Sequence, residues 1–351
     1  MIGSKLTSVS KSIKLSWLDL RGSGLSVVER LCLEEALLRH DHEERSWAIV
    51  GTHEPLRHRY LKSHSTTLPL YVTRADEPNN SCVIVMGIGG KPLELLNTEQ
   101  VKQDGVVVLK RFSGGGTVVL DHSSIWTTFI GRTKDFTHVD PYPRSIMKWS
   151  ADAVFSPAFL NLEKGQLNQQ KPTDRGGSDK NIRVLGGQKT LVPDTKSCGM
   201  EVTGSMITVP SNDSSPQTHK GEIGQFALRE NDYVLGERKM GGNAQMITKG
   251  AWLHHTSFLW DYDEENMEYL TLPKKRPDYR QDRSHDEFLV KLKTVIDDTN
   301  NRSFFNAMKD ACSNEFELDV VTLNQAMEVV HSLGGMGTWL AKSRTRIIDD
   351  F

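Results

Sequence analysis

The sequence predicts a mixed α/β fold in which a largely antiparallel sheet is flanked by helices. Two patterns support this prediction. Short runs of β-branched and other apolar residues recur along the chain and are bounded by turns rich in Gly, Pro, Asn and Asp, which is typical of strands. Other segments carry apolar residues at helical spacing, and two of them begin with a capping box.

The N-terminal part contributes one strand and one helix. Residues 17–20 form a short strand candidate that leads into a Gly-Ser-Gly turn. Ser26 and Glu29 have the spacing of a capping box, with the serine at the N-cap, so a helix should run to about Arg39. Residues 52–67 follow as a basic loop without periodicity. The predicted buried stripe of the helix consists of Leu25, Val28, Cys32 and Ala36, with Leu31 and Leu37 beside them.

The middle of the chain is rich in strand candidates. They are residues 68–73, 81–87, 107–110, 117–121 and 124–131. The second candidate is almost entirely apolar, which predicts a central strand covered on both faces. A helix should follow over residues 145–155, with Ile146, Trp149 and Ala153 directed inward.

Residues 163–222 interrupt this pattern. They are rich in Gln, Asn, Ser, Gly, Pro and Lys and hold few large apolar residues, which predicts a long and mostly disordered insertion. Two weak apolar runs within it, residues 183–185 and 206–209, could add a hairpin.

Beyond the insertion, residues 233–235 and 238–240 are strand candidates joined by Gly236-Glu237, the spacing of a two-residue hairpin turn. Residues 246–260 continue as strands. The last part is predicted to be helical at residues 288–296 and 303–312, and again from a Thr322/Gln325 capping box to Gly334. The predicted organisation is a flexible tail or short transit peptide at 1–16, a domain at 17–286 interrupted at 163–222, and a helical extension at 287–351.

The composition excludes several classes of protein. The 351 residues carry a formal net charge of −2, so the chain lacks the broad basic field of a nucleic-acid-binding protein. No apolar stretch approaches the ~20 residues that span a bilayer. Neither a nucleic acid nor a membrane is therefore expected as a partner.

The four cysteines, Cys32, Cys82, Cys198 and Cys312, stand far apart without a C-x-x-C pair. This spacing argues against a zinc site and a disulfide scaffold and favours a reducing compartment; no metal-ligand set is expected. The first sixteen residues hold three lysines, five serines and no acidic residue. Such a tail is compatible with a short transit peptide or a disordered N-terminus, so a mitochondrion or another organelle is expected, and otherwise the cytoplasm.

The most densely specified stretch combines a basic pair, a serine and three consecutive glycines. Three glycines remove every side chain from a turn, which favours close approach of a ligand to the backbone. Free N–H groups beside cationic side chains suit a carboxylate or a phosphate. The alternative is an ordinary glycine hairpin, and the spacing matches neither a Walker loop nor a dinucleotide-binding motif. The stretch is Lys110-Arg111-Phe112-Ser113-Gly114-Gly115-Gly116-Thr117.

This stretch resembles the signature of the lipoate–protein ligase A family, which is Arg-Arg-x-Ser-Gly-Gly-Gly followed by Thr or Ala, Val and a closing His-Asp. Asp121 matches the closing residue, whereas Lys110 replaces the first Arg and Leu120 replaces the His. The lysine keeps the positive charge and loses the bidentate fork of arginine.

A second stretch resembles the same family's second motif, in which Asn-Asp opens a strand and Gly-x-x-Lys returns before Gly-x-Ala. The family's following strand reads His-His-Gly-Thr, and Thr256 stands here where that glycine is usual. The motifs occur in the family's order and cover roughly residues 68–290 around the insertion. The matching residues are Asn231-Asp232, Lys239, Gly242-Asn243-Ala244 and His254-His255.

The resemblance implies a catalytic domain over residues 17–286, with a fold similar to that of biotin and lipoate protein ligases. It implies transfer of a lipoyl or octanoyl group to a lysine of a carrier lipoyl domain through an acyl-adenylate. The implied co-substrates are ATP and Mg, or pre-formed lipoyl-adenylate, together with lipoate or octanoate. The implied carriers are apo lipoyl domains of 2-oxoacid dehydrogenase E2 subunits or the glycine cleavage H protein.

The resemblance also implies the site residues. Lys239 is the predicted catalytic residue, because one buried ammonium can stabilise charge on both the carbonyl oxygen and the α-phosphate. Arg111 and the glycine N–H groups would bind phosphate or the acyl carbonyl, with Ser113 as a further donor. The residues predicted to bind substrate or adenylate are Arg111, Ser113, Gly114, Gly115, Gly116, Thr117, Asn231, Asp232, Gly242, Asn243, Ala244 and His255.

Two other functions stay open. An acyl-carrier-protein-dependent octanoyltransferase holds its acyl group on a cysteine. Pro273-Lys274-Lys275 stands here where that family has Pro-Cys-Gly, which disfavours this route and leaves Cys198 as a weaker candidate. A catalytically weakened lipoyl- or nucleotide-binding protein is the other alternative. It rests on the replacements at Leu120 and Thr256 and at Gly89-Gly90, where the family has polar side chains at the mouth of the acyl pocket.

The C-terminal residues 287–351 are fewer than expected for the accessory domain that bacterial ligases carry. The resemblance therefore implies a transferase that uses ready-made lipoyl-adenylate, or a ligase that needs an accessory chain. A basic segment at residues 273–283 could hold an acidic lipoyl domain or a nucleotide phosphate, or it is solvated. Its cationic residues are Lys274, Lys275, Arg276, Arg280 and Arg283.

Overall fold

The computed structural model describes residues 13–53, 82–169, 225–272, 276–296, 301–348 and 351. The predicted N-terminal tail, the loop after residue 53, the strand at 68–73 and the apolar runs at 183–185 and 206–209 lie outside the described residues. Among the described residues, no helix combines the length and apolarity needed to cross a membrane.

The main sheet has the strand order β11-β1-β2-β6-β10-β9-β8-β7. β1 runs parallel to both of its neighbours, β2 and β11, and the other adjacent pairs are antiparallel. The prediction of a mixed, largely antiparallel sheet is therefore confirmed. The strands are β1 (Lys14–Asp19), β2 (Ser46–Thr52), β6 (Ile125–Arg132), β7 (Phe226–Arg229), β8 (Asp232–Leu235), β9 (Arg238–Thr248), β10 (Ala251–Phe258) and β11 (Glu317–Val321).

A smaller sheet has the order β12-β4-β3-β5, formed by β3 (Val83–Met86), β4 (Val107–Lys110), β5 (Val118–Leu120) and β12 (Arg346–Ile347). β4 is parallel to β3, and β5 is antiparallel to it on the other side. The strands on either side of the glycine stretch are therefore separated by β3, and the hairpin interpretation of that stretch is wrong. The glycines cross the end of β3, where a Cβ on Gly87 would collide with the carbonyl oxygen of Gly115.

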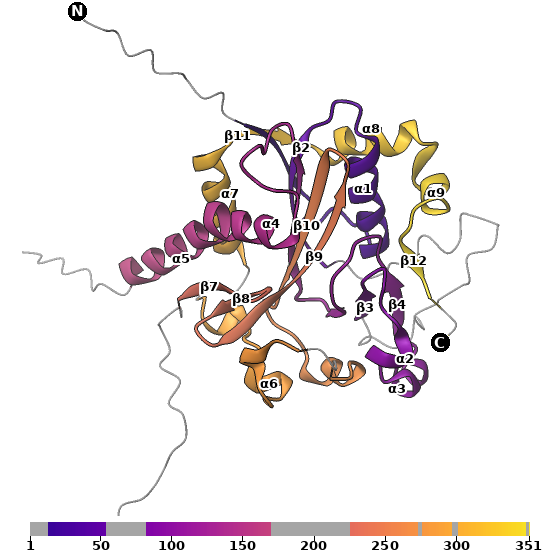
Figure 1. Cartoon of the computed structure of the whole chain (residues 1–351), viewed down its shortest axis with the longest axis vertical. Coiled ribbons are helices and arrows are strands. Elements are labelled where there is room, and N and C mark those ends of the chain that lie inside the picture. The colour runs from indigo at the N-terminus through magenta and orange to yellow at the C-terminus, as the bar shows by residue number, and fades with distance from the viewer. Residues whose placement is uncertain (1–12, 54–81, 170–224, 273–275, 297–300, 349–350) are drawn as a thin grey trace, which may run out of the picture.

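Helices cover both faces of the main sheet (Figure 1). On one side lie α4 (Pro143–Ser150), α5 (Ser156–Gln169) and α7 (Arg302–Glu315), and on the other lie α1 (Val27–His40), α8 (Leu323–Ser332) and α9 (Gly335–Leu340). Because successive side chains of a strand point to opposite faces, the main sheet has one hydrophobic cluster on each face. The first cluster lies under α4, α5 and α7 and includes Trp17, and the second lies under α1, α8 and α9 and includes Leu18. The small sheet packs into the second cluster through Val85 and Leu109.

Local sequence signals located several of these elements correctly. Ser26 caps α1: its Oγ accepts from the backbone N–H of Glu29, and its backbone N–H donates to Oε2 of Glu29, which are the two hydrogen bonds of a capping box. The Thr322/Gln325 box caps α8 in the same way. The turn at Gly236 has φ +57° and joins β8 to β9, so the predicted hairpin is confirmed.

Other predictions were wrong or incomplete. Residues 288–296 are not one helix: α6 (His285–Phe288) ends there, and only a 3₁₀ turn at Leu292–Thr294 follows. Residues 289–291 between them are extended, because Val290 donates to the carbonyl of Lys239 and Leu292 to that of Leu259. α5 continues to Gln169, inside the predicted insertion. The strands β2, β7, β11 and β12 and three short helices were not predicted; the helices are α2 (Pro92–Leu95), α3 (Thr98–Gln103) and α9.

Candidate functional site

A cavity of about 670 Å³ lies where the small sheet faces β9 and β10. Its walls include β5 from the small sheet and residues 242–245 and 255–258 from the two long strands. Lys239 and Ala244, both in the lining, are five residues apart on β9, which is about 17 Å of extended chain. The cavity therefore has two ends. One is largely apolar, with Val27, Leu31, Leu120 and Trp126, and the other is charged, with Asp232, Lys239, Arg276 and Arg280.

Lys239 and Asp232 form an ion pair at the charged end. The Nζ of Lys239 lies 2.8 Å from Oδ1 of Asp232, and Oδ2 of Asp232 accepts a 2.9 Å hydrogen bond from the hydroxyl of Tyr279. Burial and the neighbouring carboxylate raise the pKa of Tyr279, so its hydroxyl stays protonated and can donate. The backbone of Lys239 is fixed as well, since its carbonyl accepts from Val290. This arrangement positions one ammonium group at the cavity wall.

Arg111 organises the glycine loop from inside the protein. Its Nε donates to Ser113 Oγ at 3.1 Å and its Nη1 to the carbonyl of Val85 at 3.1 Å. Its Nη2 donates to the carbonyls of Gly114 and Gly116. Burial lowers the pKa of Arg111 to about 10, so the guanidinium still carries its charge at neutral pH. These bonds commit the guanidinium largely to the loop, whereas the resemblance assigns it to phosphate or the acyl carbonyl.

The same inward arrangement applies to Ser113 and Gly114, neither of which lines the cavity. Ser113 is fully buried, and the N–H of Gly114 donates to the carbonyl of Gln245 on β9. Gly115 has φ +112°, and a Cβ there would lie 2.8 Å from both Arg111 Nη2 and the carbonyl oxygen of Asn243. Glycine is required at this position because the loop presses directly on β9.

A buried chain of polar groups leads from this loop to α1. Ser113 Oγ lies 3.3 Å from Nδ1 of His255, and Nε2 of His255 lies 2.6 Å from Glu34 Oε2. Burial lowers the pKa of His255 in spite of the carboxylate beside it. Burial would raise the pKa of Glu34, but Arg30 and His255 hold it below its ordinary value. The groups therefore form a neutral imidazole that donates from Nε2 to an ionised Glu34.

The neighbouring histidine has a different role. His254 is fully buried outside the cavity lining, between the hydroxyl of Tyr233 and the side-chain amide of Gln245. Burial lowers its pKa to about 3, so it stays neutral in the folded protein. The unusual Thr256 beside it donates to Oδ1 of Asn243 at 2.9 Å and so orients an amide at the cavity wall.

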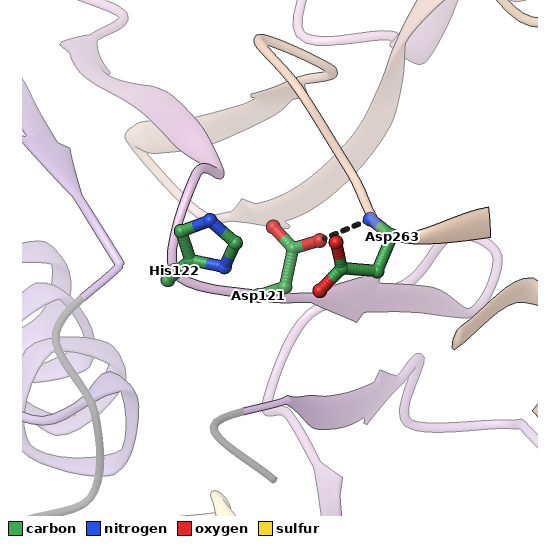
Figure 2. Close-up of side chains that lie close together, drawn as sticks. All are labelled: Asp121, His122 and Asp263. Atoms are coloured by element: carbon green, nitrogen blue, oxygen red, sulfur yellow. Dashed lines mark hydrogen bonds between the residues drawn. The ribbon is translucent and has the colours of Figure 1, made fainter. Parts of the chain in front are cut away.

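Asp121, which closes the first motif, ties two loops together (Figure 2). Its Oδ1 accepts from the N–H and hydroxyl of Ser123, and its Oδ2 accepts from the backbone N–H of Asp263 at 3.1 Å. His122 and the Asp263 carboxylate lie close by, with possible ligand atoms within 4.8 Å of one another. Because both oxygens of Asp121 already accept hydrogen bonds from the chain, its contacts here serve to join the end of β5 to residues 261–263.

The structure brings most of the predicted site residues together. The cavity lining includes Arg111, Gly115, Gly116, Thr117, Asn231, Asp232, Lys239, Gly242, Asn243, Ala244 and His255. Sequence reasoning missed Glu34 and Tyr279, which position His255 and Asp232. A glutamate inside the apolar run of α1 was the available signal for Glu34, and Tyr279 offered none.

Residues 63–162 and 207–317, together more than half of the chain, match the model for the lipoyl protein ligase A/B catalytic domain. The chain belongs to this family. The replacements at Lys110, Leu120 and Thr256 are therefore variations within the lipoyl protein ligase A/B family, and the glycine loop and Lys239 lie in its catalytic domain.

One curated relative and two solved structures are similar to this chain over most of its length. It is 26% identical over 291 residues to a Plasmodium falciparum protein named inactive lipoate–protein ligase 2, covering 79% of this chain and 63% of that protein's length. A lipoate–protein ligase A structure with bound ATP is 16% identical, with a TM-score of 0.52 over 92% of this chain and 94% of the other. A bi-partite lipoate protein ligase from Thermoplasma acidophilum is 14% identical, with a TM-score of 0.50 over 93% and 97%. At these identities the structural likeness establishes the fold.

Proposed function

We propose that this chain transfers a lipoyl or octanoyl group to the lysine of a carrier lipoyl domain through an acyl-adenylate. The observation that supports the proposal is the Lys239–Asp232 ion pair, set in the wall of a cavity that has one apolar and one cationic end. An acyl-adenylate has the same two-part character, an apolar tail joined to a charged nucleotide.

The residues at each end fit that molecule. Val27, Leu31 and Leu120 offer an apolar surface to an acyl chain. Lys239 would neutralise charge that develops on the acyl carbonyl oxygen and the α-phosphate. In the activating step a carboxylate oxygen of the acid bonds to the α-phosphorus of ATP and pyrophosphate leaves. In the transfer step the carrier's amine bonds to the acyl carbon, loses a proton, and AMP leaves.

The test is a mass measurement on an apo lipoyl domain mixed with the purified full chain. Separate reactions contain lipoate with Mg-ATP, lipoyl-adenylate, and octanoyl-acyl carrier protein. A mass gain with Mg-ATP identifies a self-sufficient ligase, and a gain with adenylate alone identifies a transferase. The Lys239→Ala variant should give no gain above the uncatalysed level, and the exposed Lys249, changed to Ala, is the matched control. A Lys239→Ala variant with full activity contradicts the mechanism.

A catalytically weakened binding protein is the second candidate, because a relative at 26% identity is named inactive and Leu120 replaces the family's histidine. This candidate predicts that lipoyl-adenylate binds and that no donor yields product. Binding measured by calorimetry, beside the mass assay, separates it from the transferase.

The cysteine-dependent octanoyltransferase has less support. Within the described part of the chain, Cys32, Cys82 and Cys312 are buried, and none of them lines the cavity. Burial raises the pKa of Cys32 and Cys82 to about 12, which disfavours a thiolate nucleophile. Cys198 lies outside the described residues. Acyl transfer that survives a Cys198→Ser change and thiol alkylation excludes the route.

An accessory chain and an organellar location belong to the same proposal. The Thermoplasma acidophilum relative is a bi-partite ligase studied with its E2 lipoyl domain, which supports an E2 lipoyl domain as carrier here and a second chain for activation. The lysine- and serine-rich first sixteen residues support import into an organelle.

A further inference from the structure

Two carboxylates and one imidazole meet where the end of β5 lies beside the segment that follows β10 (Figure 2). They belong to Asp121, His122 and Asp263, and each residue offers one ligand atom that lies within 4.8 Å of the other two. In the part of the chain that the structure describes, this is the group of three such side chains close enough to share a metal ion. Asp263 lies 142 positions after Asp121, so no local spacing in the sequence indicates this set.

The carboxylate of Asp121 is buried and held in one orientation. Its Oδ1 accepts hydrogen bonds from the N–H of Ser123 at 3.1 Å, from the hydroxyl of Ser123 at 2.8 Å and from Ser124 Oγ at 3.2 Å. Its Oδ2 accepts a single hydrogen bond among the described residues, from the N–H of Asp263. Because a carboxylate oxygen has two lone pairs, Oδ2 keeps one for a cation. The serines would then act as the outer-shell partners that orient a metal ligand.

The other two side chains are free to move toward a common ion. His122 and Asp263 are exposed, and neither side chain has a hydrogen bond or an ion pair among the described residues. Ligand atoms roughly 2.1 Å from a tetrahedral ion lie about 3.4 Å apart, so the observed separations must shrink by up to ~1.4 Å. Rotation of the two exposed side chains can close this difference without breaking a contact.

The described residues supply no cation to this pair of carboxylates. Neither Asp121 nor Asp263 has a lysine or arginine as an ion-pair partner there. Lys291 and Lys293 are the lysines of this region, and both bind Asp261, at 3.7 Å and 3.1 Å. Lys291 also binds a second carboxylate at 3.1 Å. Two carboxylates joined through one backbone hydrogen bond repel each other, and a divalent cation between them would offset that repulsion.

We propose that Asp121, His122 and Asp263 form a binding site for a divalent transition-metal ion of the zinc class. The imidazole nitrogen favours such an ion over Mg²⁺ and Ca²⁺, which prefer oxygen ligands. Three protein ligands leave the remaining coordination to water on the exposed side. The ion would join the end of β5 to the segment after β10. Since Leu120 and Leu259 from these two segments line the cavity, a bound ion would also stiffen the cavity wall.

The test measures metal binding by the full chain, prepared without a polyhistidine tag and stripped with a chelator. Calorimetric titrations with Zn²⁺, Mn²⁺ and Mg²⁺ give affinity and stoichiometry, and the visible absorbance of added Co²⁺ reports nitrogen and oxygen coordination. The variants are His122→Ala and Asp263→Asn, which should fold because both residues are exposed and without side-chain partners among the described residues. The control is the double variant His331→Ala/Asp140→Asn, which changes the same residue types at exposed positions outside the cluster.

The unchanged protein and the control should show a zinc site that both variants lose. Each variant should weaken zinc binding by about a hundredfold or more, because loss of an outer-shell partner alone typically costs ~10–100-fold. Ser123→Ala, which removes one such partner, should have the smaller effect. Mg²⁺ should bind the unchanged protein at least about tenfold more weakly than Zn²⁺. Zn²⁺ should raise the Tm of the unchanged protein and of the control by more than that of either variant.

The proposal is overturned if the unchanged protein binds no Zn²⁺, or if both folded variants bind it with unchanged affinity and stoichiometry, which places the ion elsewhere. It is also overturned if Mg²⁺ binds as tightly as Zn²⁺ and His122→Ala has no effect, which identifies a carboxylate pair that attracts any divalent cation. If one variant does not fold, the result for the other decides. No acyl transfer is measured, so this proposal can fail while the proposed function stands.

Discussion

The ammonium of Lys239 lies 2.8 Å from a carboxylate oxygen of Asp232, and the two residues belong to opposite strands of one hairpin. The hydroxyl of Tyr279 holds the other carboxylate oxygen at 2.9 Å. The position of the ammonium is thus set by a carboxylate that is itself fixed.

This ion pair predicts that Asp232 affects the rate of acyl transfer by positioning the ammonium of Lys239. Asp232→Asn keeps the shape and removes the charge, so the transfer rate should fall about tenfold, less than the roughly hundredfold or greater loss expected for Lys239→Ala. The measurement is the initial rate of carrier acylation from lipoyl-adenylate. An Asp232→Asn variant with the normal rate shows that the ion pair does not position the ammonium.

The buried contacts of Glu34 predict that replacing this residue greatly lowers the stability of the fold. Its Oε1 accepts from Arg30 and Thr128 and its Oε2 from His255, all in the interior. Glu34→Leu leaves the Arg30 charge buried without a partner, which should lower the free energy of unfolding by about 3–5 kcal/mol. Urea denaturation followed by tryptophan fluorescence measures this. The double variant with Arg30→Met should recover part of the loss, and a single-variant loss below about 1 kcal/mol contradicts the account.

The glycine loop offers a matched pair of variants. Gly115→Ala introduces a Cβ 2.8 Å from Asn243 O at φ +112°, so the free energy of unfolding should fall by about 1–3 kcal/mol. At Gly116 a Cβ meets no atom within 4 Å, and Gly116→Ala should change stability by about 0.5 kcal/mol or less. Thermal unfolding compares the two. Equal losses of stability for the two variants would show that the loop at Gly115 does not pack closely against β9.

Stability should depend on pH through His254. Its pKa is about 3 in the folded protein, because of burial, and about 6.5 in the unfolded chain. Between these values only the unfolded chain takes up the proton, so the free energy of unfolding falls as pH drops below about 6.5, by up to ~1.4 kcal/mol per pH unit. Urea denaturation at pH 7, 6 and 5 measures the slope. His254→Gln should reduce the slope, whereas a change at the exposed His331 should leave it unaltered.

The sequence revealed those parts of the fold whose signals are local. The capping boxes of Ser26 and Thr322 and the turn at Gly236 each involve neighbours within a few residues, and each was located correctly. The order of β4, β3 and β5 depends on pairing between distant segments, so the glycine stretch was mistaken for a hairpin. Residues 288–296 have helical periodicity, but hydrogen bonds to Lys239 and Leu259 keep residues 289–291 extended and so interrupt the helix.

The same distinction applies to the site. The motifs named the residues that line the cavity but not the direction in which each one points. Arg111 is turned toward the carbonyls of its own loop. Glu34 finds its partners 94 and 221 positions away, at Thr128 and His255, and no local pattern encodes such a contact. The residue types that make up the site could therefore be predicted from the sequence, whereas the hydrogen-bond partners of each side chain could not.

The parallel pairing of β11 with β1 has a consequence for synthesis of the chain. β1 is made first, yet one of its edges stays open until residues 317–321 have left the ribosome. An open strand edge is a template for aggregation. A premature stop between residues 290 and 316 would keep every residue of the described cavity lining and still release a sheet with that edge exposed. Such a truncated product is expected to be lost through insolubility, with its cavity-lining residues all present.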